Sequence, residues 1–137
     1  MKNTKTPKYI LLAALLCIIA IAVWYHMPVK LLDADPDKVA KISIFDGNQG
    51  KQIEVADAEK IRRIVESLDS VTVRRRGISL GYTGYRFRLE VYTHSGESEK
   101  LAAQFIVNTA DSIRRDPFFY RVESGEVDFD FIQSLFS

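Results

Sequence analysis

The chain has 137 residues, of which 47% are hydrophobic and 27% charged, and its formal net charge is +1, so net charge carries no functional signal. The length leaves room for one domain of ordinary size after an apolar N-terminal segment, and for no second domain. The single cysteine, Cys17, lies inside that segment, which excludes a disulfide, a cysteine-based zinc site and a thiol nucleophile from the globular part.

Residues 9–29 contain no Asp, Glu, Lys or Arg and are rich in Ile, Leu, Ala and Val. About 20 apolar residues suffice for a helix to cross a bilayer, and Trp24 and Tyr25 stand where aromatic rings settle at the headgroups. The residues before this run include three lysines and no acid, whereas acidic residues soon follow it. The positive-inside rule therefore predicts a single-pass cell-membrane protein, with a cytoplasmic N-terminus at 1–8, a transmembrane helix at 9–29 and an extracytoplasmic remainder.

Three interpretations of the apolar run compete. An uncleaved signal anchor is favoured, because Trp24 and Tyr25 extend the run beyond a typical signal-peptide core. A cleaved signal peptide would use Ala20 and Ala22 as the small residues before the cut. A lipoprotein signal would end at Cys17, but it needs a small residue directly before the cysteine, where Leu16 stands.

Residues 30–37 are predicted to link the helix to a globular domain at 38–137, since Pro36 interrupts any helical continuation. Asp33, Asp35 and Asp37 also resemble the start of a calcium-binding EF-hand loop. The sixth loop position, however, holds Lys38 where glycine is required, and the twelfth holds Ile44 where glutamate is required. The linker interpretation is favoured over calcium binding.

The first half of the domain shows clear periodicity. Residues 39–45 and 51–55 alternate apolar and polar side chains around an Asp46-Gly47-Asn48-Gln49-Gly50 turn, which predicts a hairpin. Asp57 is a suitable N-cap for a helix over 58–68. The apolar face of that helix comprises Ile61, Ile64, Val65 and Leu68.

Three more strands are predicted at 71–76, 85–93 and 101–107, with a glycine-rich loop at 77–84. The apolar residues of the second and third of these strands are all odd-numbered, so pairing them on one face requires an odd loop or a bulge, which Gly96 can provide by adopting positive φ. We expect Leu101 to point inward and Phe87 to lie opposite Phe105.

Residues 108–117 are polar and turn-rich, 118–123 form the predicted last strand, and 128–136 form a closing helix with Phe129, Ile132 and Phe136 inward. The predicted order is therefore β-β-α-β-β-β-β-α. Short connections between most strands favour the α+β class, with an antiparallel sheet and both helices packed on one face.

The pattern resembles that of small single-pass cell-envelope proteins of Gram-positive bacteria with an uncharacterised extracytoplasmic α+β domain. The resemblance covers most of residues 39–136 and rests on the segment 42–47, the helix after Asp57, the central hairpin, and Tyr120 before an acidic closing helix. It implies an extracytoplasmic location, and no known reaction or site residue.

An enzyme is not predicted, and no cofactor is expected. His94 is the one histidine of the domain and lies in a predicted turn beside a serine, where exposure is more usual than catalysis. Asp128 and Asp130 stand at a helix start, where carboxylates stabilise the positive end of the helix dipole. The two histidines and one cysteine of the chain supply too few ligands for a transition-metal site, and no phosphate-binding glycine loop follows a strand.

The distribution of arginine is the one functional signal. If the strands at 71–76 and 85–93 are neighbours, four outward arginines and a tyrosine form a basic patch suited to phosphate or carboxylate. The candidate ligand- or partner-binding residues are therefore Arg74, Arg76, Arg86, Arg88 and Tyr92. The competing interpretation is a solvated sheet face whose arginines are neutralised by acids such as Glu90.

Three functions follow. The first is a membrane-tethered module that binds a protein or an anionic cell-envelope partner; nucleic acid is disfavoured by the compartment. The second is a small cell-envelope enzyme that would gather His94, Tyr82 or the acidic pair near the arginines. The third is an assembly subunit whose transmembrane helix contacts a larger complex through small residues, namely Ala13, Ala14, Ala20 and Ala22.

Overall fold

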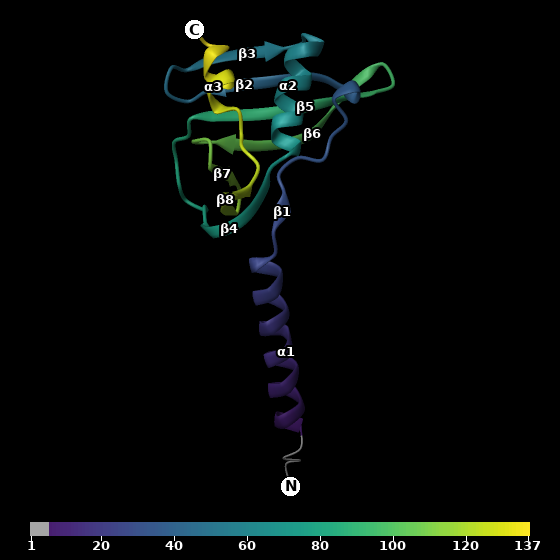
Figure 1. The fold of residues 1–137 in the computed structure, drawn as a ribbon. Helices are drawn as coiled ribbons and strands as arrows, with labels where there is room; N and C mark the ends of the chain where they lie inside the picture. Colours follow the sequence, from purple (N-terminus) through teal and green to yellow (C-terminus); the bar gives the residue numbers. More distant parts are fainter. Residues whose placement is uncertain (1–5) are drawn as a thin grey trace.

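The computed structural model describes residues 6–137 and has the predicted α+β class (Figure 1). A long N-terminal helix, α1 (Thr6–His26), precedes a domain built on one antiparallel sheet of eight strands. The predicted element order is confirmed, and two short strands are added to it. Most of the predicted segment 1–8 lies outside the described residues.

Helix α1 stands away from the domain, and residues Pro7–His26 are long and apolar enough to cross a membrane, a property that signal sequences share. The helix ends at His26, three residues before the predicted boundary. Pro28 accounts for the earlier end, because a proline disfavours helical geometry in the residue before it.

The predicted linker at 30–37 is wrong in its first part, because the domain begins earlier. Strand β1 (Val29–Lys30) pairs with β4 (Thr72–Ile78), and Leu31 and Leu32 are buried in the core. Asp35 then caps a short 3-10 helix, η1 (Pro36–Lys38). Two adjacent leucines flanked by charged residues contribute their apolar surface to the core, which ties the chain to the sheet directly after α1.

The sheet has the order β1-β4-β8-β7-β6-β5-β2-β3, and every pair is antiparallel. Strand β7 falls in the segment 108–117 that was predicted to be a turn; it has four residues, too few to show a period. The remaining strands are β2 (Val39–Asp46), β3 (Lys51–Val55), β5 (Phe87–Ser95), β6 (Ser98–Val107), β7 (Ser112–Arg115) and β8 (Phe118–Ser124).

Helices α2 (Ala58–Asp69) and α3 (Phe129–Ser134) lie on the same face of the sheet (Figure 1). Asp57 caps α2 as predicted, accepting a hydrogen bond from the Lys60 amide at 3.0 Å. The rings of Phe129 and Phe136 lie against Phe87, each with centroids 5.4 Å from it. The four apolar residues predicted for α2 are all buried, namely Ile61, Ile64, Val65 and Leu68.

The predicted pairing of Phe87 with Phe105 is wrong: Phe105 lies opposite Leu89, and Phe87 lies opposite Val107. The predicted bulge is present, but it lies at Ala102 and not at Gly96. Val91 pairs with Ala103 and Tyr92 pairs with Leu101, so Ala102 has no partner on β5. Gly96 does adopt positive φ (61°), in a tight turn. The shift leaves Leu101, which was expected inside, 44% exposed.

Candidate functional site

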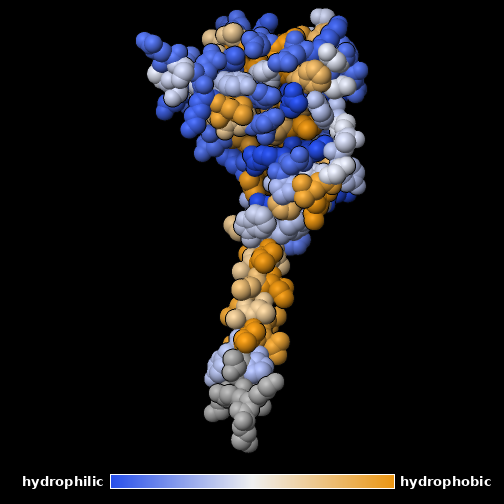
Figure 2. All heavy atoms as spheres, turned by 180° about the vertical axis from the view of Figure 1, so that it is seen from behind, coloured by the Kyte–Doolittle hydropathy of each residue, from blue (hydrophilic) through white to orange (hydrophobic). Residues whose placement is uncertain are grey.

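The face of the sheet opposite α2 and α3, called the open face here, carries the side chains that alternate with the core residues. Figure 2, seen from behind the view of Figure 1, shows hydrophilic side chains over most of this side of the domain. The charged and aromatic residues of the open face include Arg74 and Arg76 on β4, Arg88, Glu90 and Tyr92 on β5, Arg114 on β7, and Phe119 and Arg121 on β8.

The five predicted site residues do not form one patch, because β4 and β5 are not neighbours. Strands β8, β7 and β6 lie between them. Strands consecutive in sequence are adjacent in roughly two-thirds of cases, and here the loop 79–86 carries the chain across the end of the sheet instead. Arg74 and Arg76 are therefore separated from Arg88 and Tyr92 by three strands.

The β5 residues form a group in which Glu90 balances the charge of Arg88, although the buried Nε atom of Arg88 has no hydrogen-bond partner among the described residues. Arg88 lies 3.5 Å from Glu90 and donates a hydrogen bond to the Tyr85 hydroxyl at 3.2 Å. The Tyr92 hydroxyl donates to the other oxygen of Glu90 at 2.5 Å, and this hydrogen bond raises the pKa of Tyr92. One carboxylate thus serves both an arginine and a tyrosine of the predicted site. We call these residues, Arg88, Glu90 and Tyr92, the paired cluster.

Arg86 lies outside both groups. It precedes the regular part of β5, and its guanidinium carbon is 4.9 Å from the ring centroid of Phe87, which is a core residue. Its backbone amide donates to the Asn108 side chain at 3.1 Å, and its carbonyl accepts from the Gly47 amide at 2.7 Å. These backbone hydrogen bonds hold the start of β5, whereas the buried Nε atom of the Arg86 side chain has no hydrogen-bond partner among the described residues.

The arginines at the other end of the open face are only partly compensated. Arg74 pairs across the strands with Arg121, and like charges in that position repel each other. Glu123 lies 2.7 Å from Arg74 and raises its pKa by accepting a hydrogen bond. Within residues 6–137, neither Arg76 nor Arg121 has an ion pair.

Arg76 and Arg121 border a surface hollow of about 360 Å³, which we call the Arg76–Arg121 hollow. Its one carboxylate belongs to Asp111, which already accepts a hydrogen bond from the Thr109 hydroxyl at 2.7 Å. Two planar guanidinium groups beside a hollow suit a phosphate or carboxylate, which they can bind in bidentate fashion. The lining residues are Arg76, Asp111, Ser112, Phe119, Tyr120 and Arg121.

The prediction included Arg76 but omitted Arg121 and Phe119. Arg121 lies opposite Arg74, and Arg121 and Phe119 line the same hollow as Arg76, so these side chains share one side of the sheet. The alternation within residues 118–123 was a signal for this, since it places odd-numbered residues on one face, but the partner strand could not be read from the sequence.

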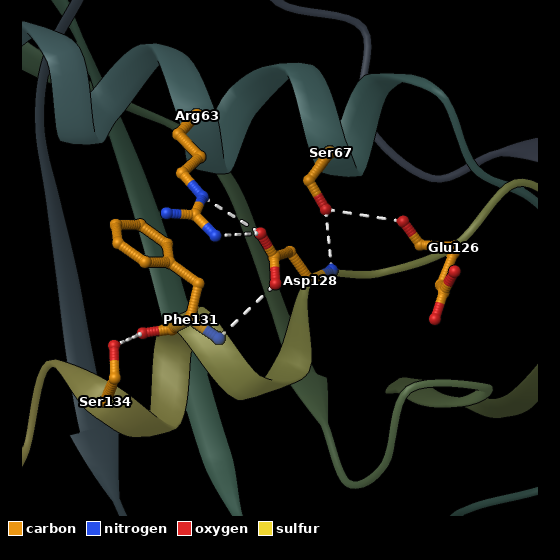
Figure 3. A network of polar contacts seen from close by, with 6 residues as sticks. All are labelled: Arg63, Ser67, Glu126, Asp128, Phe131 and Ser134. Carbon is orange, nitrogen blue, oxygen red and sulfur yellow. Dashed lines mark hydrogen bonds and ion pairs between the residues drawn. The ribbon is translucent and has the colours of Figure 1, made fainter.

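Asp128, the first member of the candidate acidic pair, has a structural role (Figure 3). Its carboxylate caps α3 by accepting from the Phe131 amide at 3.4 Å and lies 2.9 Å from Arg63 of α2. Its own amide donates to the Ser67 hydroxyl at 2.7 Å. Asp128 therefore joins the two helices, whereas Asp130 is exposed.

The other candidate catalytic and metal-binding residues do not converge. His94 is exposed in the β5–β6 hairpin, and Tyr82 packs on Phe119 in a different part of the domain. The three linker aspartates have different partners: Asp33 lies near Lys30, Asp35 caps η1, and Asp37 lies 2.6 Å from Arg62. Among the residues that the structure describes, no group of three His, Cys, Asp or Glu side chains is placed to hold a metal ion.

Comparison of the chain with protein-family models, curated proteins and solved structures returns no match, so the resemblance to Gram-positive cell-envelope proteins stays a prediction.

Proposed function

We propose that the protein is a membrane-tethered, extracytoplasmic binding module that takes an anionic group of a partner in the Arg76–Arg121 hollow. Helix α1 is its uncleaved anchor, with the N-terminus in the cytoplasm. The partner is a protein or another component of the cell envelope. The observation that carries the proposal is the pair of unneutralised arginines at one hollow of the open face.

The junction between α1 and the domain supports an anchor that is kept. The rings of Trp24 and Tyr25 pack edge-on against Phe118, with centroids 5.9 Å and 5.7 Å away. The Arg75 guanidinium lies 3.9 Å from the centroid of the Trp24 ring and donates to the Trp24 carbonyl at 3.1 Å. The end of α1 thus has specific partners in the domain, which a segment destined for removal does not need.

The cost of the arginine arrangement supports a ligand. An exposed like-charge pair across two strands destabilises a sheet by roughly 0.2–1 kcal/mol. Of Arg74, Arg76 and Arg121, only Arg74 has an ion-pair partner among the described residues, and that partner is Glu123. An arriving anion would relieve this repulsion, so the interaction should weaken as salt increases.

The test is co-purification from solubilised membranes with the full-length protein and two double variants. Arg76→Ser/Arg121→Ser removes two charges at the hollow, and Lys51→Ser/Lys100→Ser removes the same charge at exposed positions elsewhere on the domain. We expect a specific partner to be lost with the first variant and retained with the second. Loss with the second variant alone would contradict the proposed site.

The same experiment addresses the alternative assembly function, which would act through α1. That function is favoured by the exposure of α1: no residue of its membrane-length segment is buried, and Trp24 and Tyr25 at its end contact the domain through Phe118 and Arg75. Partners that both double variants retain, and that are lost when α1 is replaced by an unrelated transmembrane helix, would support assembly and would overturn binding at the hollow.

A further inference from the structure

Exposed apolar side chains of the domain are concentrated in one short segment. After Met27, the large hydrophobic residues that are exposed among the described residues are Ile78 (64%), Leu80 (66%), Tyr82 (61%) and Leu101 (44%). Three of these four lie within residues 78–82, which we call the apolar turn. Single exposed apolar residues need no explanation, but three in five residues indicate a contact.

The apolar turn is held rigidly in this exposed conformation. The Tyr82 amide donates to the Ser79 carbonyl at 3.2 Å, and Gly81 between them has φ of 85°, which together form a β-turn of type II with Leu80 at its corner. Ser79 itself is fully buried: its amide donates to the Pro117 carbonyl at 2.8 Å and its hydroxyl donates to Asp116 at 2.5 Å.

Asp116 is fixed in turn by Arg114, 2.9 Å away, and these two partners lower its pKa. The Tyr82 ring packs edge-on against Phe119 at 5.0 Å. The turn is therefore anchored through Ser79 while Ile78 and Leu80, on either side of it in sequence, stay in solvent. Because the turn is already ordered, less conformational entropy is lost when its apolar side chains bind another surface.

The apolar turn lies at the end of the domain that meets α1. Ile78 is paired with Phe118 across β4 and β8, and Phe118 contacts the rings of both Trp24 and Tyr25 at the end of α1. Figure 2 shows apolar side chains on the lower part of the domain, next to the helix. Residues 77–84 carry no charged side chain, and an arginine stands on each flank, at Arg76 and Arg86.

We propose that the apolar turn inserts into the headgroup region of the same leaflet in which α1 ends, so that the domain has a second contact with the bilayer. The inference rests on the proposed function in one respect, that α1 is a transmembrane anchor. Its chemistry is that of interfacial anchoring: apolar side chains and a tyrosine enter the boundary between the headgroups and the acyl chains. Trp24 and Tyr25 contact Phe118, which is the cross-strand partner of Ile78, and aromatic rings at the end of a transmembrane helix settle at the level of the headgroups.

Insertion would restrict the orientation of the domain on the membrane. The contacts of Trp24 and Tyr25 with Phe118 already hold the domain against the end of α1, and a second contact with the lipid beside Phe118 would further fix which side of the domain faces away from the membrane. The Arg76–Arg121 hollow shares Phe119 with the Tyr82 contact, so the inserted turn would hold the hollow close to the membrane surface.

The test places an environment-sensitive fluorophore on the turn of the full-length protein in vesicles of phosphatidylcholine and phosphatidylglycerol. Leu80→Cys is labelled in a Cys17→Ala background, and Leu101→Cys on the β5–β6 hairpin is the matched control. We expect the fluorophore at position 80 to show a blue-shifted emission and quenching by lipid-borne quenchers, and the fluorophore at position 101 to show neither.

Identical, water-like behaviour of the two labels would overturn the insertion. The state of the anchor is read separately, by extraction of the vesicles with alkaline carbonate. If the protein resists extraction while position 80 stays in water, the transmembrane anchor is supported and insertion of the apolar turn is overturned. If carbonate extracts the protein, α1 is not a transmembrane anchor, and the membrane part of the proposed function is overturned as well.

Discussion

The two ends of the open face use the same residue type differently. In the paired cluster, Glu90 forms an ion pair with Arg88 and accepts a hydrogen bond from Tyr92, so the charge of Arg88 is balanced within the cluster. At the Arg76–Arg121 hollow, Glu123 serves Arg74 and leaves the other two arginines without an ion-pair partner among the described residues. On this arginine-rich sheet face, the candidate binding site is therefore the part where arginines lack a carboxylate partner.

The comparison also separates the costs of the two arrangements. The paired cluster is half-buried, so Tyr92 depends on Glu90 for its hydrogen bond and Arg88 depends on Glu90 for charge compensation. The arginines at the hollow are exposed and repel each other. The first arrangement is expected to contribute to stability, whereas the second is expected to reduce it and is the one for which we propose a ligand.

The largest effect on stability is expected from Glu90→Ala. This change removes the acceptor of the Tyr92 hydroxyl and the ion-pair partner of Arg88, so it should lower the free energy of unfolding by about 1–3 kcal/mol. Urea unfolding of the full-length protein in detergent, followed by circular dichroism, measures it. Glu123→Ala, at the exposed pair, should cost less than about 1 kcal/mol. Equal losses would remove the distinction between the two ends.

A smaller effect of opposite sign is expected from Arg121→Ser. Removing one member of the cross-strand pair with Arg74 should leave stability unchanged or raise it by about 0.2–1 kcal/mol. Arg88→Ser should lower it in the same unfolding experiment, because Glu90 and Tyr85 lose a partner. Destabilisation by Arg121→Ser of the size seen for Arg88→Ser would show that Arg121 is structural.

The smallest effect is expected on the pKa of Tyr92. Glu90 raises the pKa of Tyr92, so the neutral phenol is the form that the fold stabilises. This contribution is fully present below the unfolded pKa of about 10 and is lost as pH rises through the higher folded pKa. Ultraviolet difference spectra between the protein and its Tyr92→Phe variant should place Tyr92 above that value, and Glu90→Gln should bring it back down. A Tyr92 titration that Glu90→Gln leaves unchanged would contradict the hydrogen bond.

The elements with a strong period were predictable from the sequence. The helix after Asp57 and the strand around Leu89 show one apolar face each, and the structure buries those faces as expected. The register of β6 was not predictable, because Leu101, Ala102 and Ala103 are consecutive apolar residues that mark neither face. Strand β7 was too short to show any alternation.

The candidate site was predicted only in part, because it depends on which strands are neighbours. Arg76 could be named from the run of three arginines at 74–76, whereas Arg121 was not among the predicted residues. Their shared hollow arises because β8 pairs with β4, a contact between residues at least 40 positions apart in the chain. Local patterns carry no information on such pairing, so Arg88 and Tyr92 were included wrongly in one patch with Arg74 and Arg76.

The central claim is that the hollow, and not the paired cluster, receives an anion. Arginine side-chain NMR spectra of the full-length protein in nanodiscs, titrated with inorganic phosphate, test this claim most directly. Saturable shifts of the Arg76 and Arg121 guanidinium signals, with the Arg88 signal unmoved, are the predicted result. Shifts of equal size at all three arginines, or none at Arg76 and Arg121, would contradict it.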